Sequence, residues 1–534
     1  MSDLTPAAPA VPTHSRPLAR TGTRGPDVGT LLVAEGPSAG STTSALSILL
    51  SLTIGASALS LSGYFVPSIE FSLLDSTMFL GLFALGAATL AAIGGALRKT
   101  MLLVYSSYTV IASLAFVVAT AYSAQYGPYS PVYLMDRYSE GDDARIYEKA
   151  VRPAIGRRDL APTDGETNAP LHWYVNVRLE EAIVAMTGRP QMMLGNALSI
   201  VFGSITSALI VGAIGLALRT AAKKRFPNGI PVGFVLACPW LLAASIMAIR
   251  DVWLYAVFAA ALYGGLAVSR WTPARRALGL AAVSLACGAA CFFLRIEMTP
   301  TVVALVFIAG TTVKDRPQTG LRELLNVVGI LVVLATTVVT PTLSGMRQDS
   351  VYDAIARRSA DYSGAATFEA GAQGTVNGFI GGSGPTRVVF RTLWMPLQPL
   401  PRILIHLGNT YHIGKLLMPV WNLALLTSVL LLRRPRYDAG PHALPVLRRY
   451  RWLLLWMLAM TILVGTTSGE SRHLYVVLPV ACVVLADVFQ TRATGPAEVV
   501  AAWHKGVLTG AGVLLFSIIF SWVFFGWDAM VVSG

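Results

Sequence analysis

The stretch IPVGFVLACPWLLAASIMAIRDVWLYAVFAAALYGGLAV, residues 230–268, decides the fold class. Only Arg250 and Asp251 interrupt its apolar character. A helix needs about 20 apolar residues to cross the hydrocarbon core of a bilayer, so this run is too long for one span and fits a hairpin of two. Apolar residues make up 54% of the 534-residue chain. The sequence therefore predicts an all-α, polytopic transmembrane helical bundle.

Further apolar runs of similar length follow one another along the chain. Together with this hairpin they predict thirteen spans, at about 44–66, 76–97, 101–122, 192–218, 230–249, 252–268, 277–294, 298–313, 323–343, 411–432, 452–468, 474–490 and 506–526. Residues 1–43 are rich in Pro, Thr, Ala and Gly, which predicts a disordered tail before a single transmembrane domain over 44–534.

The basic residues predict the orientation of these spans. If the N-terminus is cytoplasmic, every short cytoplasmic turn is basic, as the positive-inside rule requires. Such turns contain Arg98 and Lys99, Lys223 to Arg225, Arg275 and Arg276, and Arg433 and Arg434. The net charge of +13 is then an orientation signal and predicts no nucleic-acid partner. In a bacterium, the C-terminus and two long loops with short amphipathic helices, about 123–190 and 344–410, would be periplasmic, and the protein would lie in the inner membrane.

The four cysteines, Cys238, Cys287, Cys291 and Cys482, all lie inside apolar runs. Cys287 and Cys291 are one helical turn apart, but no disulfide framework or zinc spacing is present. The sequence favours their packing as small side chains between helices.

The first long loop contains GDDARIYEKAV, residues 141–151, a dense mixed-charge segment. Asp142 or Asp143 can cap a helix that begins near Ala144 and carries Tyr147. One interpretation is a solvated helix start at the membrane surface. The functional interpretation is a general base, and an adjacent carboxylate pair could instead hold a divalent cation such as Mg²⁺ or Mn²⁺.

The same loop ends with TDGETNAPLHWY, residues 163–174, which combines polar side chains with aromatic ones. Such a combination suits the faces and hydroxyl groups of sugars. An interfacial aromatic belt is the alternative for the aromatic residues, and His172 could be a structural histidine.

Three predicted outer hairpins each carry an arginine. They are IRD with Arg250, LRIE with Arg295, and ESRH with Arg472 and His473. Snorkelling of each arginine to the interface is the simpler alternative. If the hairpins converge, they form a cationic socket, because the planar guanidinium group suits phosphate oxygens.

These motifs resemble those of the GT-C class of integral-membrane glycosyltransferases, which use polyprenyl-phosphate sugars. GDDARIYEKA is similar to their acidic first-loop motif, NAPLHWY to their Pro-Leu-aromatic segment, and RDVWLY, LRIEMTP and SRHLYVVLP to their arginine-bearing hairpins. The resemblance implies that Asp142 or Asp143 is the base. It implies that the substrate-binding residues are Lys149, Tyr147, His172, Arg250, Arg295, Arg472 and His473. The donor would be a polyprenyl-phosphate-linked sugar, and the acceptor a lipid or glycan.

Two alternatives stay open at this point. The chain also resembles Wzy-type polymerases of undecaprenyl-diphosphate-linked repeats, which rely on outer-face arginines. A lipid or oligosaccharide transporter is the alternative of another class, although internal repeats and charges near the bilayer midplane, which are common in transporters, are not evident.

Overall fold

The computed structural model describes the chain in separate segments. These are residues 39–65, 73–125, 170–188, 191, 193–218, 233, 235–312, 389, 392–393, 395–398, 400, 403, 405–406, 410–432, 449–467, 471–492, 495–527 and 531–532. The chain divides into two compact units, Met1–Leu46 and Ser47–Gly534. Of the first unit only residues 39–46, the start of one helix, are described, and the other described residues belong to the second unit.

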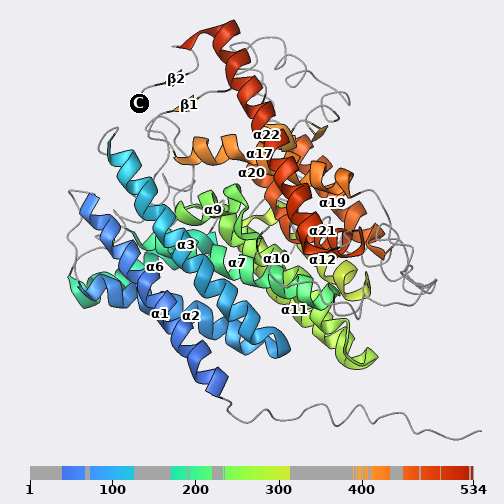
Figure 1. Ribbon diagram of the computed structural model, residues 1–534. Coiled ribbons are helices and arrows are strands. Elements are labelled where there is room, and N and C mark those ends of the chain that lie inside the picture. The colour runs from blue at the N-terminus through green and yellow to red at the C-terminus, as the bar shows by residue number, and fades with distance from the viewer. Residues whose placement is uncertain are drawn as a thin grey trace, which may run out of the picture. The chain divides into compact units, whose positions relative to one another are not determined.

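The described elements are helices with one short strand pair (Figure 1). The first half contains α1 (Ala39–Leu61), η2 (Ser62–Phe65), α2 (Leu73–Ile93), η3 (Gly95–Leu97), α3 (Arg98–Ala124), α6 (Pro170–Thr187), α7 (Leu194–Leu218), α9 (Pro239–Ile246) and α10 (Asp251–Val268). The second half contains α11 (Pro273–Leu294), η6 (Ile296–Met298), α12 (Thr299–Thr312), η8 (Met395–Leu397), β1 (Ile405–His406), α17 (Thr410–Leu431), α19 (Arg451–Thr467), α20 (Ser471–Leu474), η9 (Tyr475–Val477), α21 (Leu478–Arg492), α22 (Pro496–Phe525) and β2 (Val531–Val532). The two strands pair in parallel, with Ile405 opposite Val531.

Nine of the described helices are long and apolar enough to cross a membrane, which confirms the prediction of a multi-pass helical membrane protein. They cover Ala45–Phe65, Leu73–Ile93, Gly95–Ala124, Leu194–Leu218, Asp251–Val268, Pro273–Leu294, Ile413–Leu431, Arg472–Phe489 and Ala497–Phe524. Two shorter apolar helices, Ile296–Thr311 and Arg451–Val464, coincide with two further predicted spans. The predicted span at 323–343 lies outside the described residues.

The prediction of one continuous helical span at 230–249 is wrong, because the helix is broken. Its helix α9 has only eight residues, and both flanking residues, Cys238 and Met247, are extended. Proline explains the break at the start of α9, because Pro239 has no backbone N–H group and disfavours helical backbone at the residue before it. At the other end, Met247 is extended, and the Ile249 N–H group then donates to the carbonyl oxygen of Met247 at 2.8 Å in a tight turn before Arg250.

Helix α7 is the central helix of the second unit (Figure 1). It packs against α2, α3, α9, α10 and α21, and nearly all of its residues are buried. Small residues permit this packing: a Cβ atom on Gly203 would collide with the hydroxyl group of Ser245, and one on Gly212 would lie 2.9 Å from the ring of Tyr263. Close approach through small residues is typical of helix packing in membranes, where the hydrophobic effect does not drive helices together.

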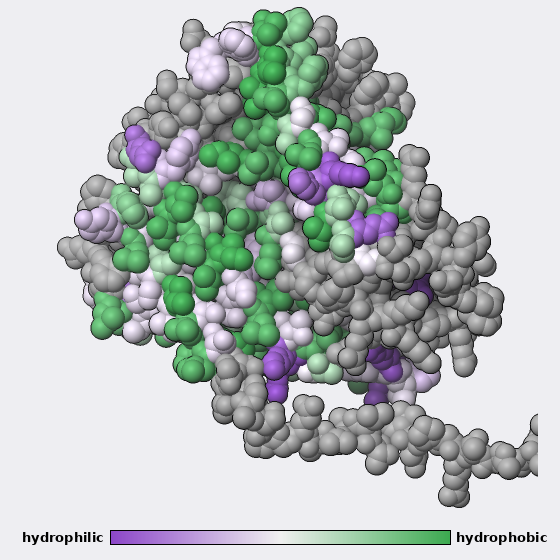
Figure 2. All heavy atoms as spheres, in the orientation of Figure 1, coloured by the Kyte–Doolittle hydropathy of each residue, from purple (hydrophilic) through white to green (hydrophobic). Residues whose placement is uncertain are grey.

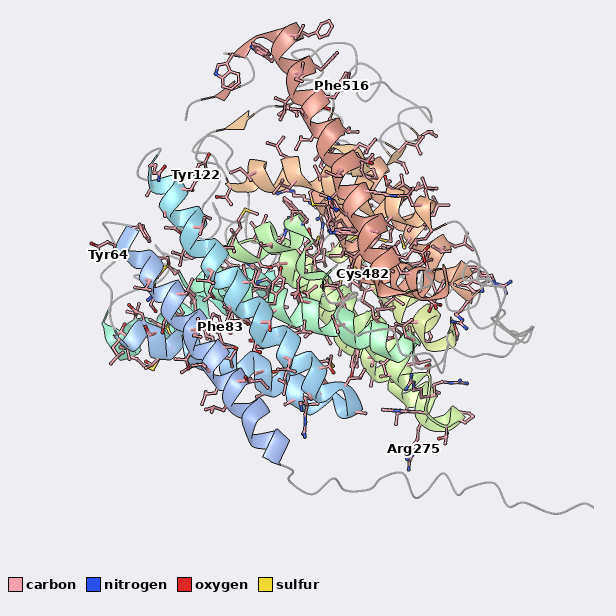
Figure 3. The ribbon with its side chains drawn as sticks, in the orientation of Figure 1. Tyr64, Phe83, Tyr122, Arg275, Cys482 and Phe516 are labelled. Atoms are coloured by element: carbon pink, nitrogen blue, oxygen red, sulfur yellow. The ribbon has the colours of Figure 1, made fainter. Side chains whose placement is uncertain are left out.

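The surface and the helix ends fit a bilayer. Figure 2 shows apolar residues over much of the described part of the visible face. Exposed apolar side chains on α22 include Leu515, Phe516 and Val523. Figure 3 shows Tyr64 and Tyr122 at one end of the helices and Arg275 at the other. Tyrosine favours the membrane interface, and the two ends therefore differ in chemistry.

Helices α17 and α22 form the most extensive described helix pair. Gly506 and Gly510 lie one turn apart on α22 and face backbone carbonyl groups of α17. A Cβ atom on Gly510 would lie 2.6 Å from the carbonyl oxygen of Val420, and one on Gly506 would collide with that of Ala424. The two glycines thus allow the helix backbones to touch.

This contact predicts a position-specific effect of alanine. Gly510→Ala should lower the thermal unfolding midpoint of the detergent-purified protein, because overpacking against backbone typically costs about 1–3 kcal/mol. Gly512→Ala is the matched control, since nothing lies within 4 Å of a Cβ atom there. Alanine should leave or slightly raise the midpoint at position 512, because it favours helix more than glycine does. Equal midpoints for the two variants would show that the close α17–α22 contact is absent.

Candidate functional site

The predicted hairpin arginines lie in a buried cluster where α10 begins. Arg250 precedes α10, and its carbonyl oxygen accepts the N–H groups of Trp253 and Leu254 at 3.0 and 3.1 Å. Asp251 forms the first turn and is 3% exposed. A carboxylate at this position is stabilised by the partial positive charge of the helix N-terminus.

The second hairpin, between α11 and α12, contributes Arg295. This residue is extended, with φ −162° and ψ 92°, and connects α11 to η6. Its Nε donates to Oε1 of Glu297 at 2.8 Å, and its Nη1 lies 3.9 Å from Oδ1 of Asp251. Arg295 is therefore held by its own hairpin and paired with the neighbouring one.

The third hairpin, formed by α20 and η9, contributes Arg472. Its Nε lies 3.9 Å from Oδ2 of Asp251, so the two oxygens of Asp251 each face a different arginine. The hydroxyl group of Tyr255, one turn after Asp251, donates to the carbonyl oxygen of Arg472 at 2.6 Å. Trp240 of α9 donates in turn to the Tyr255 hydroxyl at 2.8 Å. Side-chain and backbone contacts thus both fasten this hairpin to α10.

Two guanidinium groups share one carboxylate in this cluster. Arg295 and Arg472 both face Asp251, Arg295 also bonds to Glu297, and the neighbouring Arg250 is buried. A distance of 3.9 Å is too long for a hydrogen bond, so both contacts to Asp251 are ion pairs. Buried charge is costly unless it is compensated, and a group of neighbouring guanidinium groups favours an anion as a ligand.

Helix α6 lies in the predicted outer loop and begins within NAPLHWY. Pro170 suits the first helical position, where the missing N–H group has no helical partner. Buried residues recur along α6 at helical spacing, namely His172, Trp173, Asn176, Val177, Glu180 and Ile183. The opposite face carries the exposed pair of Arg178 and Glu181, with 2.9 Å between Nη1 and Oε2. The helix is thus amphipathic, as the sequence predicts for this loop.

The buried face of α6 brings His172 to α10. The rings of His172 and Trp253 lie edge to face with 5.1 Å between centroids, and Trp253 stacks on Phe202 of α7 at 4.1 Å. Asn176 donates to the carbonyl oxygen of His172, and Asn196 of α7 donates to that of Ile246, both at 2.7 Å. The ends of α6, α7 and α10 therefore meet beside the arginine cluster.

The structure brings together only part of the predicted site. His172, Arg250, Arg295 and His473 are buried, and Arg472 is mostly buried. The second and third hairpins meet the first at Asp251, which the sequence presented only as a neighbour of Arg250. The predicted residues Asp142, Asp143, Tyr147 and Lys149 lie outside the described residues.

Sequence reasoning missed several residues around this site. Asp251, Trp253 and Tyr255 lie at one helix start, and Asn176 and Asn196 are amides on the buried faces of helices. In the sequence, the two asparagines were the signal that could have indicated these polar contacts, because a buried amide needs hydrogen-bond partners.

The described residues offer neither a disulfide bond nor a metal-binding site. The four cysteines are buried and unbridged, as expected for packing residues. Within the described segments, no group of three or more His, Cys, Asp or Glu side chains could hold a metal ion.

Comparison with models of known protein families, with characterised proteins and with solved structures found no match. The residues themselves are therefore the basis for any statement about function.

The cluster predicts a large stability effect at Asp251. Asp251→Asn should lower the thermal unfolding midpoint strongly, because removing one partner from buried ion pairs typically costs about 3–5 kcal/mol. Glu181→Gln is the control: it removes an ion pair whose side chains are 50% and 30% exposed, and such pairs contribute roughly 0–1 kcal/mol. A midpoint for Asp251→Asn equal to that of Glu181→Gln would show that Asp251 does not hold the hairpins together.

Proposed function

We propose that this membrane protein is a glycosyltransferase that takes a sugar from a polyprenyl-phosphate donor and transfers it to a lipid or glycan acceptor. The observation that supports this most directly is the convergence of three arginine-bearing hairpins on Asp251. The cluster is buried among apolar helices long enough to span a membrane, and the guanidinium groups of Arg295 and Arg472 share the carboxylate of Asp251. A phosphate group attached to a lipid has the charge and the location that such a cluster selects.

The proposed location is the inner membrane of a bacterium, with the N-terminus in the cytoplasm and the arginine hairpins at the periplasmic face. The basic turns at the opposite helix ends support this orientation. On that face nucleotide-sugars are inaccessible, which favours a donor attached to lipid. A reporter that is active in the cytoplasm when fused after residue 160 would overturn the orientation.

The proposed reaction needs a base and a site for the leaving group. The base removes the proton from an acceptor hydroxyl group, whose oxygen attacks the anomeric carbon of the donor. The bond from that carbon to the phosphate oxygen breaks, and the lipid phosphate leaves with the bonding electrons. Arg295 and Arg472 would stabilise the growing charge on the phosphate. Asp142 or Asp143 is the proposed base; if this pair instead held Mg²⁺ or Mn²⁺, chelation would abolish activity.

The runner-up is a Wzy-type polymerase. The same observation favours it, because neighbouring guanidinium groups suit a diphosphate as well as a monophosphate. The product distinguishes them, since a polymerase extends a chain and a transferase adds one sugar. A transporter is less well supported: the buried arginines of the cluster lie at helix termini, whereas transporter sites are typically near the bilayer midplane.

The anion site predicts a selective loss of lipid-phosphate binding. Arg295→Gln and Arg472→Gln in nanodiscs should each bind undecaprenyl phosphate about tenfold or more weakly, because a hydrogen bond to a charged group contributes about 1.5–3 kcal/mol. Arg275→Gln, at the opposite helix end, is the control and should bind as the wild type does (Figure 3). Affinity can be measured by microscale thermophoresis, with undecaprenol as the uncharged comparison. Equal binding of the two lipids by the wild type would refute a phosphate site.

The acidic motif predicts loss of activity without loss of folding. Asparagine preserves a helix cap but cannot accept a proton, and loss of general-base catalysis typically costs about 10²–10⁴ in rate. At least one of Asp142→Asn and Asp143→Asn should therefore keep the wild-type thermal midpoint and lose product. The measurement is glycolipid or polysaccharide product in cells that lack the native gene. Full activity of both variants would show that the motif is a solvated helix start without a catalytic role.

A further inference from the structure

A second polar group lies beside the arginine cluster and is not explained by phosphate binding. It consists of Asn176 on α6, Asn196 and Ser199 on α7, and Trp253 on α10, and we name it the amide–indole cluster. All four side chains are at most 3% exposed. Among the described residues, Oδ1 of both asparagines, Oγ of Ser199 and Nε1 of Trp253 have no hydrogen-bond partner. Buried polar atoms without partners are uncommon and require an explanation.

The contacts place the α7 and α10 members together. Asn196, Ser199 and Phe202 recur every three residues on α7 and therefore share one face. Asn196 bonds to Ile246, and Phe202 stacks on Trp253, so this face meets the segment from α9 to α10. Ser199 lies between these two contacts on the same face.

The ring of His172 connects the α6 member to the same place. It packs against Trp253, and its carbonyl oxygen accepts the amide N–H of Asn176. Asn196 likewise donates its amide N–H to a backbone carbonyl group, that of Ile246. Because a carbonyl group accepts from each amide nitrogen, both Oδ1 atoms are fixed as acceptors that point elsewhere.

The chemistry of these atoms selects a neutral, hydroxyl-bearing ligand. Two amide oxygens accept, the indole N–H donates, and the serine hydroxyl group does both. The amide oxygens would repel an anion, and the indole N–H group offers nothing to a metal cation. Several hydroxyl groups can satisfy these partners together, because each donates one hydrogen bond and accepts others.

The position of Trp253 connects the cluster to the anion site. The backbone N–H group of Trp253 bonds to the carbonyl oxygen of Arg250, so one helical turn carries both residues. Asp251 and Trp253 are two residues apart and therefore point to different sides of α10. A ligand that contacts both sides of this turn needs a phosphate group for the arginines and, next to it, hydroxyl groups for the amide–indole cluster.

We infer that the amide–indole cluster binds the hydroxyl groups of the sugar on the lipid-linked donor. This inference rests on the proposed function and adds the residues that recognise the sugar. The phosphate lies at Arg295 and Arg472, and the sugar lies across the first turn of α10. Selection among sugars then depends on the hydrogen bonds of Asn176, Asn196, Ser199 and Trp253.

The test uses two substitutions that remove a polar atom, Ser199→Ala, which removes that atom alone, and Trp253→Phe, which also makes the ring smaller. The matched control is Ser284→Ala. Ser284 is also a buried serine whose hydroxyl group has no partner among the described residues, but it lies on α11. Full-length protein in nanodiscs is titrated with undecaprenyl phosphate, and with undecaprenyl phosphate carrying a hexose, a pentose or an N-acetylhexosamine. Thermal midpoints are recorded for every variant.

The expected result is a loss confined to the sugar-bearing lipid. The wild type binds at least one sugar-bearing lipid more tightly than undecaprenyl phosphate. Ser199→Ala and Trp253→Phe weaken that binding about fivefold or more and leave the affinity for undecaprenyl phosphate unchanged. The midpoint of Ser199→Ala does not fall, because removal of an unpartnered buried polar atom is neutral or stabilising. Ser284→Ala binds both lipids as the wild type does.

The failing results separate the two proposals. No binding of undecaprenyl phosphate by the wild type overturns the phosphate site and with it the proposed function. Two other outcomes overturn the sugar-binding inference alone. In the first, the wild type binds undecaprenyl phosphate but binds no sugar-bearing lipid more tightly. In the second, the wild type and the variants bind the sugar-bearing lipid with equal affinity. In both of these cases the buried polar atoms are satisfied by water. Ser199→Ala, the smallest change, decides the outcome if Trp253→Phe does not fold.

Discussion

The two ion pairs of Asp251 hold the described site together. Its oxygens lie 3.9 Å from a nitrogen of Arg295 and of Arg472, which belong to hairpins far apart in the sequence. The guanidinium groups of Arg295 and Arg472 would repel one another without the carboxylate between them. The helix N-terminus of α10 stabilises that carboxylate. The positions of the hairpins, and the gathering of guanidinium groups that supports lipid-phosphate binding, both depend on this arrangement.

Close helix packing makes this arrangement possible. Apolar side chains gain little from leaving lipid for protein, so helices in membranes associate through small residues and short polar contacts. Gly203 and Gly212 allow α7 to approach its neighbours, and Gly510 does the same for α22. Polar residues then connect the helices, as Tyr255 does between α10 and the third hairpin. The central position of α7 directs α10, and hence Asp251, toward the other hairpins.

The start of α10 has two chemically different sides. Asp251 faces arginines on one side, and Trp253 packs against the rings of His172 and Phe202 on the other. A charged site beside a neutral hydrogen-bonding site suits a molecule with a phosphate group next to hydroxyl groups. The break after α9 contributes to this geometry, because α9 ends at Ile246 and α10 begins only at Asp251, after a turn.

The sequence by itself determined that the chain forms several helices long and apolar enough to span a membrane, because runs of about twenty apolar residues favour a bilayer. It also singled out Arg295 and Arg472, since an arginine between two apolar runs must lie at a helix end. The tertiary structure alone decided that both arginines pair with Asp251, because residues so far apart in the chain meet only through helix packing. The broken α9 and the approach of α6 to Trp253 were likewise decided by packing, which hydropathy does not report.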